Sequence, residues 1–306
     1  MRIAVTGASG FIGGAVATAL ADLDHDVVGF GRRAGGWSHP RGRYLRWDLT
    51  SAVLRPASDR AFEGVVHCAA LADDWASPRD VLRVNRDGTR AVVRSFPGAR
   101  IVHMSTSSVY DAFEPSVEVS EDAAPVRRHL SAYSHTKTLA EFELAGVDAV
   151  ILRPHAVYGP GDTTLLPRIL TGVRRGRLLL PEGAEARHSL TSIGNLVLAV
   201  RRALDPGSPR GTYNIADDVP VLLSAVLREF LERRGVDARL VSIPYGAAFA
   251  LAGTLEAAAR LTRTRPRLTR YAVSQLGMER TLDLTAARTR LAYHPAPTSL
   301  DGAEDW

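Results

Sequence analysis

The stretch that decides the fold lies at the start of the chain and reads Ile3-Ala4-Val5-Thr6-Gly7-Ala8-Ser9-Gly10-Phe11-Ile12-Gly13. Its apolar beginning, residues 3–5, predicts a short buried strand. A helix is expected to follow the glycine-rich turn and to run to about residue 21. The three glycines allow a tight turn and let the backbone approach a pyrophosphate closely. Free N–H groups at the start of the helix would then face the phosphates. We therefore expect a dinucleotide to approach the backbone at Gly7, Gly10 and Gly13.

A second strand at residues 26–31 follows at the distance typical of a β-α-β unit. It ends in Gly31-Arg32-Arg33 and not in an acidic residue. A carboxylate at this place would accept a hydrogen bond from the 2'-hydroxyl of the adenosine ribose, whereas Arg32 and Arg33 offer positive charge to a 2'-phosphate. The sequence therefore favours NADP over NAD as the cofactor.

Strands and helices continue to alternate through the first half of the chain. Further strands are predicted at residues 44–47, 64–70, 101–104 and 149–152, with a helix at 77–96. This alternation predicts an α/β fold of the Rossmann type, a doubly wound parallel sheet whose ligands lie beyond the carboxyl ends of the strands. The second half predicts mainly helices, at residues 164–174, 193–204, 221–234 and 245–261, with a brief strand at 212–215.

We expect two domains from this pattern. The dinucleotide-binding domain covers residues 1–165 and takes back a segment near 188–216. Residues 166–306 form a smaller, mostly helical domain that closes over the cofactor and shapes the substrate pocket.

Composition limits the class of protein. The chain has 306 residues, 45% of them hydrophobic, and a net charge of +5 from arginines that are distributed along its length. This distribution predicts no nucleic-acid binding. The densest basic run predicts a solvated helix end, with an acidic ligand or a membrane surface as the alternative; it comprises Arg260, Arg263, Arg265, Arg267 and Arg270. Because Cys68 is the only cysteine, an internal disulfide is excluded, and the composition suits a reducing cytoplasm. We assign no chemical role to Cys68. The most apolar window, residues 247–261, is interrupted by Glu256 and is too short for membrane insertion.

A second informative stretch is Tyr133-Ser134-His135-Thr136-Lys137, at the start of a predicted helix. It carries the only lysine of the chain. Side chains at i and i+4 lie on one helix face, so Tyr133 and Lys137 can serve one small volume. A neighbouring cation favours the ionised form of a phenol, which would let Tyr133 exchange a proton near neutral pH.

In order along the chain, these elements resemble the extended short-chain dehydrogenase/reductases, the NAD-dependent epimerase/dehydratase family. Seven motifs carry the resemblance: Thr6-Gly7-x-x-Gly10-x-x-Gly13, Asp48-Leu49, His67-Cys68-Ala69-Ala70, Asn85-x-x-Gly88-Thr89, Ser105-Thr106-x-x-Val109-Tyr110, Tyr133-x-x-x-Lys137 and Arg153-Pro154-x-x-Val157-Tyr158-Gly159-Pro160-Gly161-Asp162. The resemblance implies three catalytic residues. Tyr133 is the general acid/base, Lys137 lowers its pKa and holds the nicotinamide ribose, and Thr106 orients the substrate oxygen.

The resemblance also implies further cofactor contacts. Asp48 and Leu49 meet the adenine, and Ala69 and Ala70 meet the central part of the cofactor. The pyrophosphate meets Gly7, Gly10, Phe11, Ile12 and Gly13. The remaining expected contacts are Asn85, Pro154 and His155, together with Tyr133 and Lys137 themselves.

Departures from subgroup patterns favour one chemistry over another. Ser107-Ser108 follows Thr106 at the position where the sugar-nucleotide dehydratases of the family have an Asp-Glu pair. Ala156 stands where many nucleotide-sugar members have Asn. The C-terminal stretch from residue 268 to 295 resembles bacterial 3β-hydroxysteroid dehydrogenases and 2-alkyl-3-oxoalkanoate reductases. We therefore expect hydride transfer to or from a secondary alcohol or ketone on an apolar, steroid-like or β-keto acid-like substrate. The alternatives are a nucleotide-sugar epimerase or reductase and, less favoured, a non-catalytic cofactor-binding regulator.

Five residues are candidates for contact with this small-molecule substrate: Asp73, Trp75, Ser107, His155 and Arg187. An exposed loop is the alternative for Asp73 and Trp75, and a structural role for His155 and Arg187. No Cys, His and carboxylate spacing suggests a metal site. The family resemblance is also compatible with a homodimer.

Overall fold

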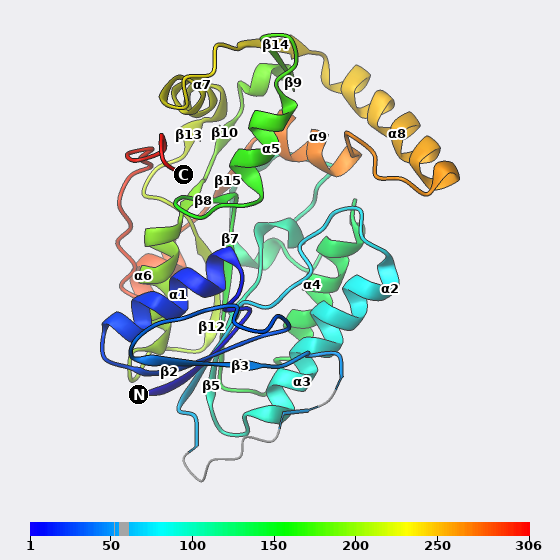
Figure 1. Ribbon diagram of the computed structural model, residues 1–306. Coiled ribbons are helices and arrows are strands. Elements are labelled where there is room, and N and C mark those ends of the chain that lie inside the picture. Colours follow the sequence, from blue (N-terminus) through cyan, green and yellow to red (C-terminus); the bar gives the residue numbers. More distant parts are fainter. Residues whose placement is uncertain (52, 55–60) are drawn as a thin grey trace.

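A parallel sheet of seven strands forms the centre of the molecule, which the computed structural model describes over residues 1–51, 53–54 and 61–306 (Figure 1). The strand order is β12-β7-β5-β4-β1-β2-β3. Their bounds are β1 Arg2–Thr6, β2 Asp26–Gly31, β3 Gly42–Arg46, β4 Gly64–His67, β5 Arg100–Met104, β7 Ala149–Pro154 and β12 Gly211–Ile215. Because β2 and β3 lie on one side of β1 while β4 and the later strands lie on the other, the chain reverses direction across the sheet at β1 and β4. Ligands of such sheets bind beyond the carboxyl ends at this reversal.

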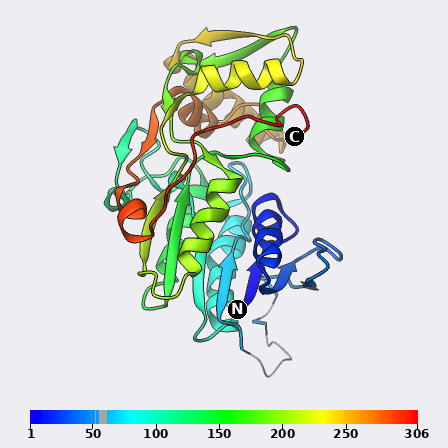
Figure 2. The ribbon, with the colours of Figure 1, turned by 90° about the vertical axis from the view of Figure 1, so that its left-hand side faces the viewer.

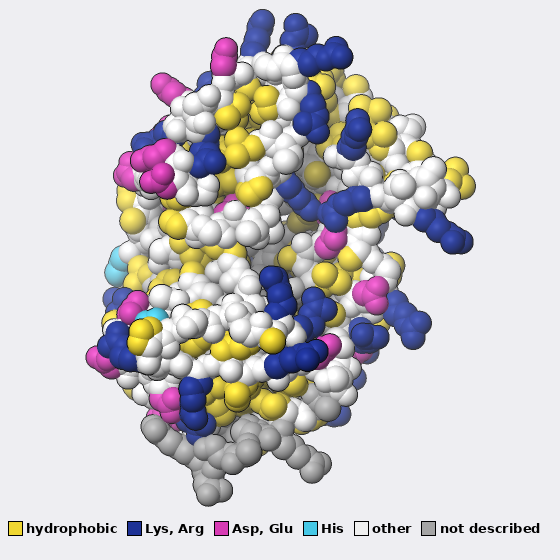
Figure 3. Space-filling model, viewed as in Figure 1, with side chains coloured by type: hydrophobic (Ala, Val, Ile, Leu, Met, Phe, Trp, Pro, Cys, Tyr) yellow, Lys and Arg dark blue, Asp and Glu magenta, His cyan; other side chains and the backbone are white. Residues whose placement is uncertain are grey.

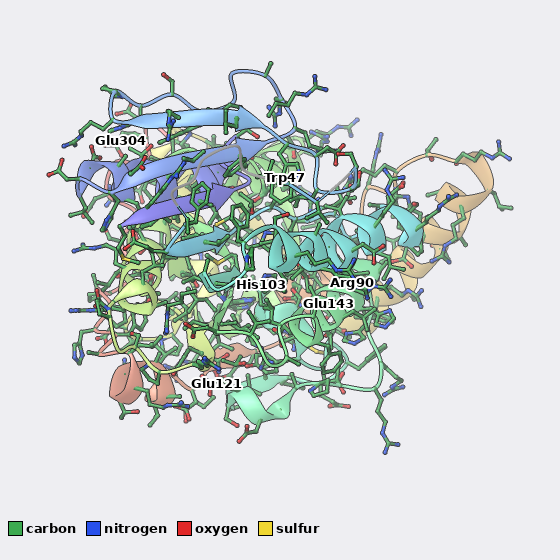
Figure 4. All side chains as sticks on the ribbon, turned by 90° about the horizontal axis from the view of Figure 1, so that it is seen from below. Trp47, Arg90, His103, Glu121, Glu143 and Glu304 are labelled. Atoms are coloured by element: carbon green, nitrogen blue, oxygen red, sulfur yellow. The ribbon has the colours of Figure 1, made fainter. Side chains whose placement is uncertain are left out.

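Helices cover both faces of the sheet (Figures 1 and 2). On one face α1, Phe11–Asp22, packs beside α6, Ile193–Leu204. The other face carries α2, Pro78–Val81, a π-helical turn at Leu82–Asp87, α3, Gly88–Ser95, and α4, Ala132–Phe142. An ion pair of 2.6 Å between Arg90 of α3 and Glu143 joins α3 to the end of α4 (Figure 4). The doubly wound Rossmann-type fold is confirmed.

Each face of the sheet has its own hydrophobic core, because strands covered on both sides are apolar throughout. Val5, Val66 and Leu152 belong to the core under α1 and α6, and Phe30, Val65 and Phe96 to the core under α3. The second core contains a cluster of edge-to-face aromatic rings, Phe30, Trp47, Phe62 and Phe96. The first core also takes in Tyr293, close to the C-terminus.

The second half of the chain contains most of the remaining elements. Its helices are α5 Leu165–Gly172, α7 Leu223–Arg233, α8 Tyr245–Thr262, α9 Arg270–Gly277 and α10 Thr285–Arg290. Three small sheets accompany them: β13-β10-β15-β6, β11-β8 and β14-β9. The strands are β6 Ser116–Val119, β8 Val157–Tyr158, β9 Arg177–Pro181, β10 Arg187–His188, β11 Thr191–Ser192, β13 Val221–Leu222, β14 Arg239–Ile243 and β15 Arg280–Leu282. None of the described helices is both long and apolar enough to cross a membrane.

Several predicted bounds are wrong for identifiable reasons. The strand expected at residues 64–70 ends at His67, because the chain then turns and the Ala69 N–H donates to the Thr6 hydroxyl at 3.2 Å. The helix expected at 77–96 is interrupted by the π-helical turn that contains Asn85. The helix expected at 221–234 begins only at Leu223, since residues 221–222 pair with β10. The strands of the three small sheets were not predicted, and the brief strand expected at residues 212–215 is β12 of the large sheet.

Candidate active site

The glycine turn lies at the carboxyl end of β1, where the direction of the chain reverses. Gly7 has a φ of 73°, and a Cβ at this position would lie 2.8 Å from the Ala69 nitrogen. A Cβ at Gly13 would lie 2.3 Å from the Gly7 carbonyl oxygen. Helix α1 begins after Gly10 without a hydrogen bond from any capping side chain. Its first N–H groups therefore remain available to an anion, as a dinucleotide pyrophosphate requires.

The segment after β4 passes close to this turn. Ala69 is partly buried and Ala70 is exposed, so small side chains border the place where a cofactor would cross the sheet. Asn85 lies behind them with an exposed fraction of 1%. Its side chain accepts from the Leu71 N–H at 2.8 Å and donates to the Thr136 hydroxyl at 3.0 Å. Because these contacts occupy its amide, Asn85 holds the segment after β4 against α4. Its expected contact with the cofactor stays a prediction.

The residues expected around the adenosine lie at the ends of β2 and β3. Arg32 and Arg33 have exposed side chains, while their carbonyls accept hydrogen bonds from Arg46 Nε at 3.1 Å and the Tyr44 hydroxyl at 2.8 Å. Asp48 accepts from the Thr50 N–H and hydroxyl, and these hydrogen bonds lower its pKa. Leu49 is buried in the core.

A chain of hydroxyl groups begins at the predicted catalytic tyrosine. Tyr133, on the first turn of α4, is close enough to Thr106 for the threonine hydroxyl to affect the pKa of the phenol, and Thr106 Oγ1 donates to Ser108 Oγ at 3.0 Å. Ser108 Oγ then lies 2.5 Å from the hydroxyl of Tyr271 on α9. Burial, and next the neighbouring Tyr271, raise the pKa of Tyr133, and the Thr106 hydroxyl opposes them. The phenol of Tyr133 is therefore protonated near neutral pH.

Lys137 is almost completely buried, with an exposed fraction of 2%. Its ammonium donates to the Met104 carbonyl at 2.6 Å and to His103 Nε2 at 3.2 Å, both on β5 (Figure 4 labels His103 in the interior). Burial lowers the pKa of Lys137 to about 8, against the raising effect of Glu141 and Cys68. Lys137 is not among the groups that shift the pKa of Tyr133 here, because its ammonium is bound beneath the end of β5, and its expected effect on the tyrosine stays a prediction. Met104 nevertheless comes directly before Ser105 and Thr106, so Lys137 is fixed at the edge that bears the hydroxyl groups.

A buried ion pair holds α4 in this position. Glu141, one turn beyond Lys137, pairs with Arg153 of β7 at 2.7 Å. The same carboxylate accepts from Ser105 Oγ at 2.5 Å, and Arg153 also donates to the Tyr110 hydroxyl at 3.1 Å. The helix that carries Tyr133 is thereby fastened to the ends of β5 and β7.

Two histidines continue from the hydroxyl cluster on its other side. Ser107 Oγ lies 2.9 Å from His155 Nδ1, and His155 Nε2 lies 3.2 Å from His188 Nδ1. Burial lowers the pKa of His155 well below its usual range and that of His188 to about 3, with further lowering from Arg280. Both imidazoles are therefore neutral and act as hydrogen-bonding groups.

These elements border one cavity of about 1220 Å³. The wall toward the large sheet brings together seven predicted residues: Phe11, Ile12, Thr106, Ser107, Tyr133, Pro154 and His155. Lys137 and Asn85 lie behind this wall, as their burial and contacts show. The opposite wall comes from α5, β9, α9 and the segment after α8.

Three substrate candidates do not line the cavity. Asp73 forms an ion pair of 2.8 Å with Arg265, and the Trp75 indole donates to the Thr264 carbonyl. Arg187 is exposed on β10 and its guanidinium reaches the Pro220 carbonyl. The structure does not bring these three side chains to the cavity, because Asp73 and Trp75 are bound to the adjacent residues Arg265 and Thr264 and Arg187 is bound to Pro220.

The comparisons with known proteins agree with this geometry. The model of the NAD dependent epimerase/dehydratase family matches residues 3–216. The chain belongs to this family. Its sequence is 31% identical to a 2-alkyl-3-oxoalkanoate reductase of Stenotrophomonas maltophilia, over 99% of this chain and 97% of the relative. It is 29% identical to a 4-hydroxy-2-methyl-3-oxo-4-farnesyl-3,4-dihydroquinoline-1-oxide ketoreductase of Stigmatella aurantiaca, over 99% of this chain and 95% of the relative. Among solved structures, MoeE5 in complex with UDP-glucose and NAD superposes with a TM-score of 0.73 at 25% identity, over 99% of this chain and 96% of MoeE5.

The predicted resemblance to the epimerase/dehydratase family is thus confirmed, but several residues of the cavity were not predicted as site residues. Tyr271 stood only within the stretch of C-terminal similarity, and His188 was not a candidate. Asp74 lines the cavity, whereas its neighbours Asp73 and Trp75 were the candidates. Four arginines of α5, β9 and the turn between them also line it: Arg168, Arg174, Arg175 and Arg177. Their only signal in the sequence was charge, which is common in this chain.

No group of three or more His, Cys, Asp or Glu that could hold a metal ion occurs among the residues that the structure describes.

Proposed function

We propose that this member of the epimerase/dehydratase family is an NADP-dependent oxidoreductase acting on a secondary alcohol or ketone of a largely apolar substrate. The observation that carries the proposal is that Thr106 and Tyr133 lie together on the wall of a large cavity that begins beside the glycine turn. The two relatives, which their names describe as reductases of oxo compounds, support a ketone as the reacting group.

The residues present fit a dinucleotide. The glycine turn has no room for side chains at Gly7 and Gly13, and the uncapped start of α1 offers N–H groups to a pyrophosphate. Phe11 and Ile12 reach from this turn into the cavity. When bound there, the nicotinamide supplies or accepts the hydride.

The chain's own groups then handle the proton and the oxygen. In the direction of reduction Thr106 turns its hydroxyl proton from Ser108 to the substrate carbonyl oxygen. This oxygen takes the phenolic proton of Tyr133, while the carbonyl carbon takes the hydride. A raised pKa suits this direction, because Tyr133 enters the reaction protonated. The hydroxyl chain through Ser108 to Tyr271 holds Thr106 in position. Lys137 supplies positive charge at the end of β5.

Replacing Tyr133 with Phe tests this role. General acid catalysis contributes about 10² to 10⁴ in rate, so Y133F is expected to lower kcat at least about 100-fold while NADPH still binds with parental affinity. Tyr245→Phe is a matched control, because Tyr245 stacks on Phe249 away from the cavity. Ketone-dependent oxidation of NADPH, followed by absorbance, gives the readout. Parental turnover by Y133F would exclude the tyrosine from the mechanism.

The choice of NADP rests on the exposed guanidinium groups of Arg32 and Arg33 at the end of β2. Charged hydrogen bonds to a phosphate contribute about 1.5–3 kcal/mol, so Arg32→Asp is expected to shift the ratio of NADPH to NADH affinity at least about tenfold toward NADH. An unchanged ratio would mean that Arg32 does not bind the 2'-phosphate. The experiment is needed because the similar structure of MoeE5 was solved with NAD.

A nucleotide-sugar epimerase or reductase is the second candidate, favoured by the structural likeness to MoeE5 and its UDP-glucose complex. An epimerase regenerates its own cofactor, so the purified protein would retain NAD tightly and catalyse no net oxidation. Net NADPH consumption with ketones, and none with UDP-sugars, supports the oxidoreductase. A cytoplasmic location and a homodimer stay predictions from the sequence.

A further inference from the structure

The part of the cavity away from the large sheet combines an apolar interior with a basic edge. Its interior side chains include Leu165, Ile169, Leu178, Leu180, Leu223 and Leu276. Six arginines also line it: Arg168, Arg174, Arg175, Arg177, Arg265 and Arg267. All six are exposed side chains, so they lie where the cavity meets solvent. Figure 3 shows dark blue side chains along the edges of the hollow in the middle of this face.

The charge of this edge is unusual for the molecule. The described lining has six arginines against one carboxylate, Asp74, which gives a formal charge of +5. The whole chain has a net charge of +5. The remainder of the protein is therefore neutral on balance, and its excess positive charge is concentrated at one opening.

Two carboxylates neutralise only part of this edge, because Asp73 pairs with Arg265 at 2.8 Å beside Asp74. Asp74 is already shared by Arg168 at 3.4 Å and Arg265 at 3.5 Å, and it accepts from the Thr269 hydroxyl at 2.6 Å. The other four arginines form no ion pair with any residue in the described part of the chain. Three of them, Arg174, Arg175 and Arg177, come from one tight turn, which is closed by hydrogen bonds of 2.8 and 3.0 Å between the backbones of residues 174 and 177.

An opening of this kind concentrates anions, because charges at the edge of a low-dielectric cavity focus their field into it. Guanidinium groups also match the planar geometry of carboxylate and the oxygens of phosphate. The basic edge is on the wall opposite Thr106 and Tyr133 and belongs to the second half of the chain, whereas the glycine turn for the cofactor pyrophosphate is at β1.

We infer that the substrate is an amphiphile, with an apolar body that lies along the leucines and an anionic carboxylate or phosphate head that binds the arginines at the opening. This inference rests on the proposed oxidoreductase function and names the class of its substrate. An uncharged ketone would give no reason for the unpaired arginines or for their concentration at one end of an apolar cavity. An anionic head group explains both.

The first test compares 3-oxoacyl substrates that share one chain: the free carboxylate, its methyl ester, the coenzyme A thioester and the uncharged N-acetylcysteamine thioester. We expect kcat/KM to be at least about tenfold higher for an anionic member than for its neutral counterpart, and this ratio to fall as salt rises from 0.05 to about 0.5 M. Preference for the carboxylate or for the coenzyme A thioester identifies the head group. Equal kcat/KM values without salt dependence would overturn the inference and leave the oxidoreductase function intact.

The second test changes the edge. Combining Arg174→Gln, Arg175→Gln and Arg177→Gln is expected to lower the anionic-to-neutral ratio about tenfold, with unchanged kcat/KM for the neutral substrate and unchanged NADPH affinity. The matched control combines Arg79→Gln, Arg94→Gln and Arg127→Gln, three exposed arginines outside the cavity, and should keep the ratio. A triple variant with the parental ratio, or one that loses NADPH affinity instead, would refute the inference.

A binding measurement separates this inference from the proposed function. Calorimetry of the whole protein with decanoate, decanoyl coenzyme A and uncharged decanoyl-N-acetylcysteamine requires no turnover. If the parent reduces none of the 3-oxoacyl compounds, the oxidoreductase proposal fails for them. The amphiphile inference then stands if the triple variant binds an anionic probe about tenfold more weakly than the parent, and falls if the affinities are equal.

Discussion

Replacing Gly13 with Ala tests whether the glycine turn is built as tightly as the structure indicates. A Cβ at Gly13 would lie 2.3 Å from the oxygen and 2.5 Å from the carbon of the Gly7 carbonyl. Both neighbours are backbone atoms of the turn, so no side chain can rotate away. Favourable contacts between such atoms need more than about 3 Å, and the turn or α1 has to move by roughly 1 Å.

The expected loss of stability combines two effects. Overpacking of rigid atoms costs about 3 kcal/mol, and an alanine within a helix recovers up to about 1 kcal/mol relative to glycine. The free energy of unfolding should therefore fall by about 2 kcal/mol, which corresponds to a decrease in Tm of about 4 °C. Gly194→Ala is the matched control, because Gly194 lies in the first turn of α6 and a Cβ there meets nothing within 4 Å. It should raise Tm by up to about 2 °C.

The assay is thermal unfolding with and without NADPH. Gly13→Ala is expected to lose the Tm increase that NADPH gives the parent, because the displaced turn no longer presents its N–H groups to the pyrophosphate, whereas Gly194→Ala should retain it. A Gly13→Ala protein that melts like Gly194→Ala and is equally stabilised by NADPH would refute the geometry of the turn.

Three further predictions concern the groups around Tyr133. Burial lowers the pKa of Lys137 to about 8 from 10.5, so the unfolded chain holds this proton more tightly and the contribution of Lys137 to stability rises between pH 8 and 10.5. Ketone reduction that needs the ammonium falls around pH 8, where the folded protein loses this proton. Urea unfolding and kcat measured from pH 7 to 10 test both effects, and a flat rate profile would contradict a role for the charge. Glu141→Ala leaves Arg153 as an uncompensated buried charge and should cost about 3 kcal/mol in urea unfolding, where a loss below about 1 kcal/mol would show that the pair is unimportant. Tyr271→Phe removes the hydrogen bond to Ser108 and should lower kcat about fivefold to tenfold with unchanged NADPH affinity, whereas an unchanged kcat would show that the hydroxyl chain does not hold Thr106.

Local patterns predicted what local interactions determine. Helix α6 was predicted with the observed bounds, since its apolar periodicity begins at a serine whose hydroxyl accepts from the Asn195 N–H. The strands of the large sheet were found because each is an apolar run between turns. Strands β10 and β13 were not found, because two residues are too few to show a periodicity.

The same distinction applies to the site. Residues within the recognised motifs, such as Thr106 and Tyr133, meet at the cavity as predicted. Helical spacing correctly placed Tyr133 and Lys137 on neighbouring turns, but it gave no information on which acceptors compete for the ammonium. The Met104 carbonyl and His103 come from a different strand, and only the packed structure brings them to it.

The two halves of the site are also joined by polar contacts, which has a consequence for specificity. Tyr271, from the substrate side, is hydrogen-bonded to Ser108 and through it to Thr106, while Asp74, from the segment after β4, binds Arg168 and Thr269 on the opposite wall. A substrate head group that draws Arg168 away from Asp74 loosens one of these connections. Binding of a head group at the basic edge is therefore expected to shift the wall that carries the arginines relative to Thr106 and Tyr133. Substitutions of these arginines should then affect kcat as well as KM for charged substrates.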